Sequence, residues 1–406
     1  MSWFQKYYRN YTECKLTCLC FKRLFSLIQY TCTIMTIALI TGTRPEIIKM
    51  FPIMKLFDSR SIDYTYIHTG QHYDDDLFIK FIEEFGIRKP EFQILMKEPD
   101  PIEQVSIILS KVGSIINKVQ PSLVLIEGDT NSVLASALAA LKSTIPIAHV
   151  ESGLRSNDWR TVEEHNRRMV DHVSDILFSP TETSSKNLHD EHVYGEVHTV
   201  GNTVIDAINL CLSKINPDND IIEIKNMLSL MKIDPVTASD FILVTMHRGE
   251  NVDNLGNLKQ ILTALTESNL NCIFPMHPHT RKRIQEYGLT KYLGKNIYII
   301  NPTGYTEFLR LLRKCKFVIT DSGGVQEDIT SPHIDKRALI LRDFTERPES
   351  VESGHSVLCK IEHNAILDQI KIFETNYSNG RISSSSPYGD GDSANKIVEI
   401  LVKKFT

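Results

Sequence analysis

Short apolar runs alternate with stretches of helical periodicity along most of this chain. The runs form two series, 37–41, 64–69, 123–126, 145–150 and 176–178, followed by 241–246, 271–276, 297–301, 317–320 and 338–341. Strands that alternate with helices predict a parallel sheet covered by helices on both faces. We therefore predict an α/β protein whose two domains face each other across a cleft, with functional residues just after the strands.

The length of the chain and one polar segment suggest how it divides. Its 406 residues suffice for two cores of ordinary size. Residues 212–240 are polar and interrupted by prolines, as expected of a linker with a peripheral helix. We predict one domain at 35–206, a second at 207–375, and a tail at 376–406 that ends in a helix packed back towards the first domain.

The uncharged stretch from Leu24 to Thr43 has the length of a membrane anchor or a signal sequence. Residues 36–41 instead have the pattern of a first sheet strand, which could not also cross a bilayer. We favour the strand and predict no membrane association. Residues 1–34 are then an N-terminal extension, poorly ordered, or absent if translation begins at Met35.

Charge and cysteine content exclude some classes of protein. A net charge of −5 without a long basic run argues against a nucleic-acid partner. Four cysteines are scattered singly through residues 211–359, as buried reduced thiols of a cytoplasmic protein are. Four others crowd the first 32 residues, including Cys14, Cys18 and Cys20, but without a standard zinc spacing.

The segment "TGTRPEIIKM" joins the first predicted strand to a helix. Gly42 suits a tight turn, Arg44 is a planar donor for a phosphate or carboxylate, and Pro45 suits the first turn of a helix. Lys49 follows one turn later. The segment lacks G-x-G-x-x-G, so it gives no reason to expect NAD. A structural turn with a surface arginine is the alternative interpretation.

The segment "TDSGGVQED" repeats this arrangement in the second series. Ser322, Gly323 and Gly324 at a helix start offer free backbone N–H groups to an anionic phosphate. Asp328 lies on the next turn, where it could accept bonds from ribose hydroxyls. The alternative is an ordinary helix cap without a ligand.

In the first half of the chain, carboxylates lie directly after or close after three predicted strands. They are Asp129 in "EGDTNS", Glu151 in "HVESGLRS", and Glu163 with Glu164 in "VEEHNRR". Carboxylates that face one cleft suit proton removal and the stabilisation of a cationic sugar transition state. Each alone could equally be a helix cap or an ion-pair partner.

Histidine and arginine follow strands of the second half. His247 and Arg248 come directly after one strand, where a histidine could contact a phosphate or transfer a proton. His277 and His279 could suggest a metal, but no third ligand stands at a diagnostic spacing, so we predict none. Arg347 lies in a loop after a later strand.

In order, ten segments resemble the non-hydrolysing UDP-N-acetylglucosamine 2-epimerases over about residues 36–405. They are "GTRPEIIKM", "TGQHYDD", "EGDTNSVLA", "HVESGLRS", "EEHNRR", "SPTETS", "VGNTVIDA", "VTMHRGEN", "TDSGGVQED" and "RDFTERPES". The resemblance implies two Rossmann-like domains in a glycosyltransferase-B-like fold. It also implies a homodimer that interconverts UDP-N-acetylglucosamine and UDP-N-acetylmannosamine without metal, NAD or another cofactor.

The resemblance also assigns roles residue by residue. The catalytic group would be Asp129, Glu151, Glu163 and His247. The contacts to UDP and substrate would be Arg44, Lys49, Phe308, Ser322, Gly323, Gly324, Asp328 and Arg347, and a second, activating UDP-sugar would contact Gln71, His72 and Arg248. Two positions depart from the family: Val162 replaces the usual proline before Glu163, and Asp328 replaces a glutamate.

The implied chemistry explains why these groups are needed. The C2 proton of the sugar is not beside a carbonyl, so it becomes acidic only when the bond from C1 to UDP breaks. UDP then re-adds to a 2-acetamidoglucal intermediate after reprotonation on the other face, in a cleft that excludes water. The alternatives are a hydrolysing relative that releases UDP and N-acetylmannosamine, a glycosyltransferase of the same fold, and a non-catalytic nucleotide-sugar sensor.

Overall fold

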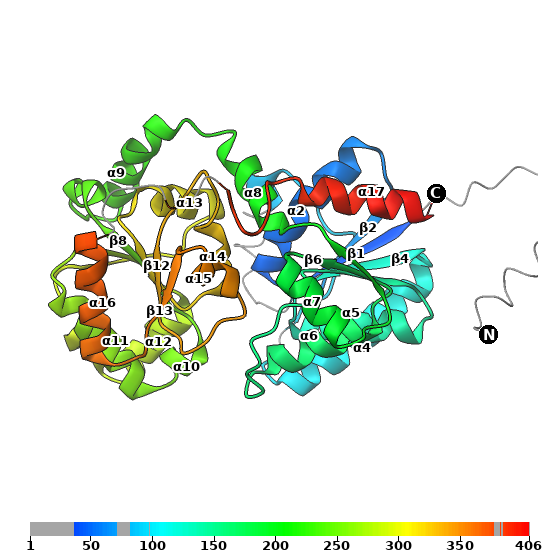
Figure 1. The fold of residues 1–406 in the computed structure, drawn as a ribbon, viewed down its shortest axis with the longest axis horizontal. Coiled ribbons are helices and arrows are strands. Elements are labelled where there is room, and N and C mark those ends of the chain that lie inside the picture. The colour runs from blue at the N-terminus through cyan, green and yellow to red at the C-terminus, as the bar shows by residue number, and fades with distance from the viewer. Residues whose placement is uncertain (1–35, 71–81, 97, 377–381, 383–384, 406) are drawn as a thin grey trace, which may run out of the picture. The chain divides into compact units, whose positions relative to one another are not determined.

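Two parallel sheets contain the strands in the described part of the chain, as Figure 1 shows. The computed structural model describes residues 36–70, 82–96, 98–376, 382 and 385–405, which belong to one compact unit, Met35–Phe405. One sheet has seven strands and the other has six, counted over these residues. The predicted α/β architecture with two parallel sheets is confirmed.

The first sheet has the strand order β3-β2-β1-β4-β5-β6-β7. Its strands are β1 (Ile37–Thr41), β2 (Tyr64–His68), β3 (Phe92–Gln93), β4 (Leu123–Glu127), β5 (Ile147–Val150), β6 (Ile176–Ser179) and β7 (Glu196–Thr199). The helices of this half are α2 (Arg44–Ser59), α4 (Pro101–Val119), α5 (Asn131–Lys142), α6 (Val162–Val173), α7 (Glu182–Asp190) and α8 (Thr203–Leu212).

The second sheet has the order β10-β9-β8-β11-β12-β13. Its strands are β8 (Ile242–Thr245), β9 (Cys272–Pro275), β10 (Ile297–Ile300), β11 (Val318–Thr320), β12 (Ala338–Ile340) and β13 (Ser356–Leu358). Its helices are α10 (Gly249–Val252), α11 (Leu255–Glu267), α12 (Pro278–Glu286), η4 (Leu289–Tyr292), α13 (Tyr305–Lys314), α14 (Gly323–Asp328), α15 (Pro348–Glu352) and α16 (His363–Asn376).

Two further segments connect or follow these halves. The polar stretch between the sheets contains η2 (Pro217–Asn219), α9 (Asp220–Leu230) and η3 (Pro235–Ser239). The C-terminal helix α17 (Ser393–Phe405) packs against α2 and α8 of the first half. The tail at 376–406 therefore ends in a helix, as predicted.

Three strands were missed by the sequence patterns, and all three lie at sheet edges. They are β3, β7 and β13, whereas every predicted apolar run overlaps a strand. A strand inside a parallel sheet is buried on both faces, so it appears as a continuous apolar run. The edge strand β7, with the sequence EVHT, has no buried residue and therefore gives no such signal.

The register of the strands brings their carboxyl ends to one edge of each sheet. In the first sheet Thr41 pairs with His68, and Glu127 pairs with Val150. In the second sheet Thr320 pairs with both Thr245 and Ile340. The loops that follow these strands therefore collect the polar side chains described below.

A continuous apolar cluster connects the two halves. The Phe51 and Phe85 rings stack with their centroids 4.5 Å apart, and the Tyr305 ring meets Phe85 edge-on at 6.2 Å. Phe51 belongs to α2, whereas Tyr305 begins α13 of the second half.

No helix among the described residues is both long enough and apolar enough to cross a membrane.

We expect Gly42→Ala to lower the free energy of unfolding by about 1–3 kcal/mol, because a methyl group would overpack the junction after β1. A Cβ built there would lie 2.1 Å from Ser132 Oγ and 2.5 Å from Thr69 Oγ1. Gly42 thus supplies space, not the left-handed backbone that a tight turn would need. Thermal and urea unfolding measure the loss.

The matched control is Gly113→Ala, also a glycine-to-alanine change but within helix α4. A Cβ built at Gly113 meets nothing within 4 Å. This variant should be slightly more stable than the wild type, by about 0.5–1 kcal/mol, since alanine restricts the unfolded chain and favours helix. Equal effects of the two substitutions would contradict the argument from packing.

Candidate functional site

Two buried cations and three buried carboxylates form the centre of the site. We call them the central ion cluster: Lys49, Glu127, Glu151, Glu327 and Arg347. The Lys49 ammonium bonds Glu151 and lies 3.0 Å from Glu327 and 3.6 Å from Glu127. Arg347 donates to Glu151 at 3.1 Å and to Glu327 at 2.8 Å.

Both halves of the chain contribute to this cluster. Lys49 belongs to α2, Glu127 ends β4 and Glu151 directly follows β5. Glu327 belongs to α14, and Arg347 precedes α15. Because strands of both sheets end here, the cluster lies where the predicted fold would place a ligand.

The charges of the cluster are nearly balanced. Burial raises the pKa of Glu127 well above its ordinary value, and it also raises the pKa of Glu327. Burial acts in the same direction on Glu151, but the charges of Lys49 and Arg347 outweigh it and lower the pKa of that carboxyl. Glu151 is therefore an ionised carboxylate at neutral pH, clamped between two cations.

The backbone at Glu151 is unusual. Its φ is +66°, in the left-handed region that a residue with a side chain rarely adopts. The amide of Asn202 also donates to Glu151 Oε2 at 3.0 Å. Such a conformation costs of order 1–3 kcal/mol and is concentrated at functional sites.

Asp129 lies close after β4 and is paired with helix α6. Arg167 Nε donates to Asp129 Oδ2 at 3.0 Å, and Asn166 donates to the Asp129 carbonyl at 3.0 Å. Arg167 also bonds Glu164 at 2.8 Å, and Glu164 is completely buried. Glu163, the predicted catalytic neighbour, instead lies on the exposed face of α6.

The turn after β11 holds the loop after β8. Asp321 accepts hydrogen bonds from the backbone N–H groups of His247 and Arg248, both at 3.1 Å, and from the Asn251 amide at 3.0 Å. Desolvation by the surrounding loops lowers the pKa of His247, although 45% of its side chain is exposed. The imidazole is therefore neutral at pH 7 and can donate a hydrogen bond without carrying a charge.

The Ser322-Gly323-Gly324 turn opens helix α14 beside Arg347. A Cβ built at Gly323 would lie 2.8 Å from Arg347 Nη1, so a larger residue here would displace the Arg347 guanidinium. Arg248 and Arg347 both bond Glu346, at 3.0 and 2.6 Å. The structure thus places the predicted phosphate-binding turn against the central ion cluster.

The remaining predicted contacts line the junction of the two halves. Arg44 donates to the Thr303 carbonyl of the second half at 3.1 Å. Asp328 accepts a hydrogen bond from the Tyr305 hydroxyl at 2.9 Å, and burial raises the pKa of Asp328 to about 7. Phe308 is half-buried and packs against the apolar cluster.

Several acidic residues of the site were not predicted from the sequence. Glu127 follows the predicted strand 123–126 and begins the segment "EGDTNS", in which only Asp129 was a candidate, and Glu327 directly precedes the candidate Asp328. Glu46 was also overlooked, although it stands within "TRPEI"; it accepts bonds from Gly42 N at 2.6 Å and from the Thr130 hydroxyl at 2.9 Å. The available signal was position, because each acid lies at or beside a junction of a strand and a helix.

Other predicted residues lie outside the described part of the chain or away from the central ion cluster. Gln71, His72 and the N-terminal cysteines fall outside the described residues. His277 accepts from the His279 backbone at 3.2 Å, and His279 pairs with Asp253 at 2.9 Å. Among the described residues, no group of three or more His, Cys, Asp or Glu side chains is arranged to hold a metal.

The four scattered cysteines have the predicted environment. Cys211, Cys272, Cys315 and Cys359 are buried and form no disulfide. Burial raises the pKa of Cys272 and Cys315 to about 12, so both thiols stay protonated at neutral pH. They therefore serve as small apolar groups of the core.

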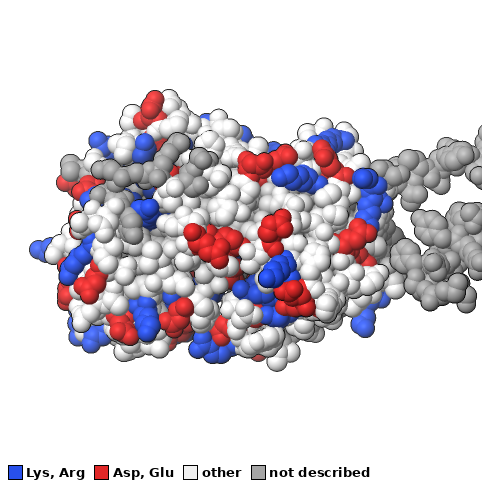
Figure 2. All heavy atoms as spheres, in the orientation of Figure 1, with Lys and Arg blue, Asp and Glu red and all other residues white. Residues whose placement is uncertain are grey.

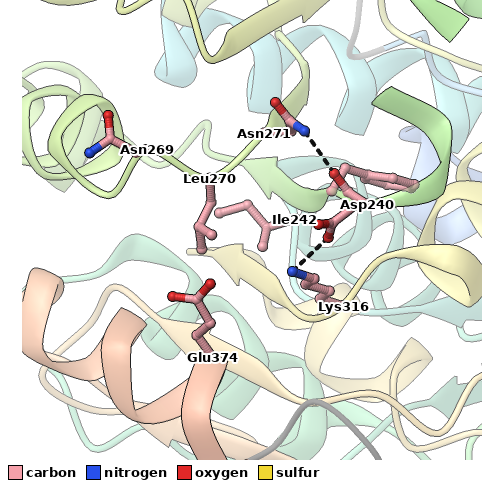
Figure 3. Close-up of a pocket in the computed structure, with 8 residues that line it drawn as sticks. Asp240, Ile242, Asn269, Leu270, Asn271, Lys316 and Glu374 are labelled. Atoms are coloured by element: carbon pink, nitrogen blue, oxygen red, sulfur yellow. Dashed lines mark hydrogen bonds and ion pairs between the residues drawn. The ribbon is translucent and has the colours of Figure 1, made fainter. Parts of the chain in front are cut away.

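A surface pocket of the second half lies at the wrong end of its sheet to join this site. Figure 3 shows Asp240, Asn271 and Lys316, which precede β8, β9 and β11. Lys316 pairs with Asp240 at 2.6 Å, and Asn271 donates to the Asp240 carbonyl at 3.0 Å.

On the face in Figure 2, acidic and basic side chains are interspersed without one broad basic patch.

We expect Glu46 to make stability depend on pH. Burial raises the pKa of this carboxyl to about 7 from an ordinary 4.5. The folded state therefore holds a proton that the unfolded chain has lost, and the free energy of unfolding falls as pH rises from about 4.5 to about 7. Thermal unfolding of wild type and Glu46→Gln across this range should show a smaller decline for the variant; parallel curves would contradict it.

Comparison with known proteins identifies the family. A model described as UDP-N-acetylglucosamine 2-epimerase matches residues 54–402. The chain belongs to this family. A UDP-N-acetylglucosamine 2-epimerase of Methanocaldococcus jannaschii is 38% identical over 376 residues, which cover 90% of this chain and 99% of the relative.

Other members of the family show the fold and the range of named substrates. The crystal structure of the M. jannaschii enzyme in complex with UDP-GlcNAc and UDP matches with a TM-score of 0.81 at 37% identity, covering 91% of this chain and 100% of that one. A UDP-2,3-diacetamido-2,3-dideoxy-D-glucuronate 2-epimerase of Pseudomonas aeruginosa is 34% identical over 375 residues, covering 91% of this chain and 100% of the relative. The chain therefore has the glycosyltransferase-B-like fold that the family resemblance implied.

Proposed function

We propose that this chain interconverts UDP-N-acetylglucosamine and UDP-N-acetylmannosamine by inverting C2 of the sugar, without net hydrolysis. The observation that carries the proposal is Glu151, an ionised buried carboxylate held by Lys49 of one half and Arg347 of the other. The named substrates of the relatives share a UDP group and a 2-acetamido sugar. A cationic junction beside carboxylates suits a leaving diphosphate next to the carbon that loses its proton.

The proposed reaction runs in two halves. The bond between C1 and the UDP oxygen breaks, with the electron pair leaving on UDP, while a carboxylate takes the C2 proton; the product is a 2-acetamidoglucal. The glucal is then protonated at C2 on its opposite face, and the UDP oxygen re-forms the bond to C1. Glu151 and Asp129 are the proposed acid and base groups, whereas Glu163 is a candidate from the resemblance alone.

The cations and amides would hold UDP between the two steps. Arg44, Lys49 and the backbone N–H groups of the 322–324 turn are the proposed diphosphate contacts, with His247 as a neutral donor and Arg347 nearby. Asp328 and Phe308 are the proposed contacts to ribose and uracil. We further propose, from the resemblance, a cytoplasmic homodimer, with Gln71, His72 and Arg248 at a second UDP-sugar site.

The decisive experiment uses the wild-type protein and UDP-N-acetylglucosamine in deuterated buffer. Proton NMR should show UDP-N-acetylmannosamine forming, with deuterium at C2 of both UDP-sugars. Free N-acetylmannosamine in amounts equal to free UDP would identify a hydrolysing enzyme instead. Tight binding of the UDP-sugar without product or deuterium would identify a nucleotide-sugar sensor.

A further inference from the structure

The C-terminal segment 385–394 crosses between the two halves beside the central ion cluster. Ser386 bonds the Thr330 hydroxyl of the second half at 2.7 Å. The Tyr388 carbonyl accepts from the backbone N–H of Asn202 in the first half at 2.7 Å. The side chain of Asn202 also donates to Glu151. Tyr388 and the proposed base Glu151 therefore share Asn202 as a hydrogen-bonding partner.

The Tyr388 hydroxyl is buried but lacks a partner among the described residues. The residue is 0% exposed, and its Oη makes no hydrogen bond. A buried polar group is nearly always paired, so an orphaned hydroxyl in this position requires an explanation. Burial first, and next the charges of Glu349 and Glu327, raise the pKa of Tyr388 well above its ordinary value, so the phenol is a hydrogen-bond donor at neutral pH.

Glu349 presents a second unsatisfied atom in the same neighbourhood. Its Oε1 accepts a hydrogen bond from the Thr181 hydroxyl at 2.5 Å, but its Oε2 is buried without a partner among the described residues. Glu349 exerts the largest single-charge effect on the Tyr388 phenol, ahead of Glu327, Arg347 and Glu151. A donor on the C-terminal segment and an acceptor on α15, both unsatisfied among the described residues, thus lie near the cluster.

We propose that the Tyr388 hydroxyl and Glu349 Oε2 together recognise a neutral polar group of the sugar. The group must accept one hydrogen bond and donate another, as a sugar hydroxyl or the acetamido group does. The diphosphate does not fit, because it accepts hydrogen bonds but has none to donate to the Glu349 carboxylate, whose charge would repel it. This inference rests on the proposed function only in taking the ligand to be a UDP-sugar.

The test compares the binding of UDP with that of UDP-N-acetylglucosamine by calorimetry, in wild type, Tyr388→Phe and Glu349→Gln. Tyr388→Phe removes only the hydroxyl, and Glu349→Gln replaces the acceptor by an amide. We expect each variant to bind the UDP-sugar about tenfold to a hundredfold more weakly, the size of one hydrogen bond to a buried group. Binding of UDP alone should stay the same, as should unfolding of ligand-free Tyr388→Phe.

The matched control is Tyr64→Phe. Tyr64 is also a buried tyrosine, but it is the first residue of β2, at the amino end of the strand and therefore away from the site. This variant should bind both ligands like the wild type. The binding assay requires no turnover, so failure of the wild type to epimerise the sugar would refute the proposed function and leave this test in force.

Three results would overturn the inference. Unchanged UDP-sugar binding by both variants would mean that a water molecule or nothing at all satisfies the two atoms. An equal loss of UDP and UDP-sugar binding would place the contact at the nucleotide. Lower stability of ligand-free Tyr388→Phe with unchanged discrimination between the ligands would make the hydroxyl a structural group.

Discussion

Glu151→Gln is expected to lower turnover of UDP-N-acetylglucosamine by about a hundredfold to ten-thousandfold, the usual contribution of a positioned acid or base. The amide keeps the shape of the carboxylate and can still accept from Asn202, which donates at 3.0 Å. It cannot take a proton from C2. Binding of UDP should change little, because the diphosphate contacts belong to other residues.

Proton NMR measures the rate, and calorimetry with UDP measures binding. Asp129→Asn should behave in the same way, with turnover lost and UDP binding kept. Glu182→Gln, an exposed change in the first turn of α7, is the control for the chemical substitution and should leave both properties unaltered. A Glu151→Gln enzyme with full activity would remove this carboxylate from the mechanism.

Lys49→Met is expected to lower the free energy of unfolding by about 3–5 kcal/mol, because it removes one partner of a buried ion cluster and leaves the others uncompensated. Three carboxylates, those of Glu127, Glu151 and Glu327, lie within 3.6 Å of the Lys49 ammonium. Arg347 alone then balances them. Urea or thermal unfolding at pH 8 measures the loss.

The loss should shrink at pH 5, since the orphaned carboxylates can bind protons in place of the lysine. Lys111→Met, a change of an exposed lysine on α4, is the matched control and should alter stability by less than about 0.5 kcal/mol. If Lys49→Met were equally harmless at both pH values, the cluster would not be the electrostatic unit described above.

The interior strands and the α/β class could be predicted because burial on two faces leaves a local trace in the sequence. The run 123–126 is apolar throughout, the run 37–41 is apolar except for Thr41, and each lies within a strand. The edge strand β7 is polar and half-exposed, so its own residues give no strand signal. It forms a strand because it pairs with the neighbouring strand β6. The post-strand positions of Arg44, Asp129 and Glu151 followed from the same pattern.

The sequence by itself determined that polar groups would collect at the carboxyl ends of parallel strands, since alternating strands and helices permit little else. Only the tertiary structure decided which acids share the buried cluster. Lys49 and Glu327 lie far apart along the chain, on helices of different halves, and come into contact only when the two halves pack together. The tertiary structure also separated Glu163 from Glu164, one exposed and one buried, because neighbouring helix positions point in different directions. A local pattern records burial, whereas contact between distant charges depends on how the two halves pack.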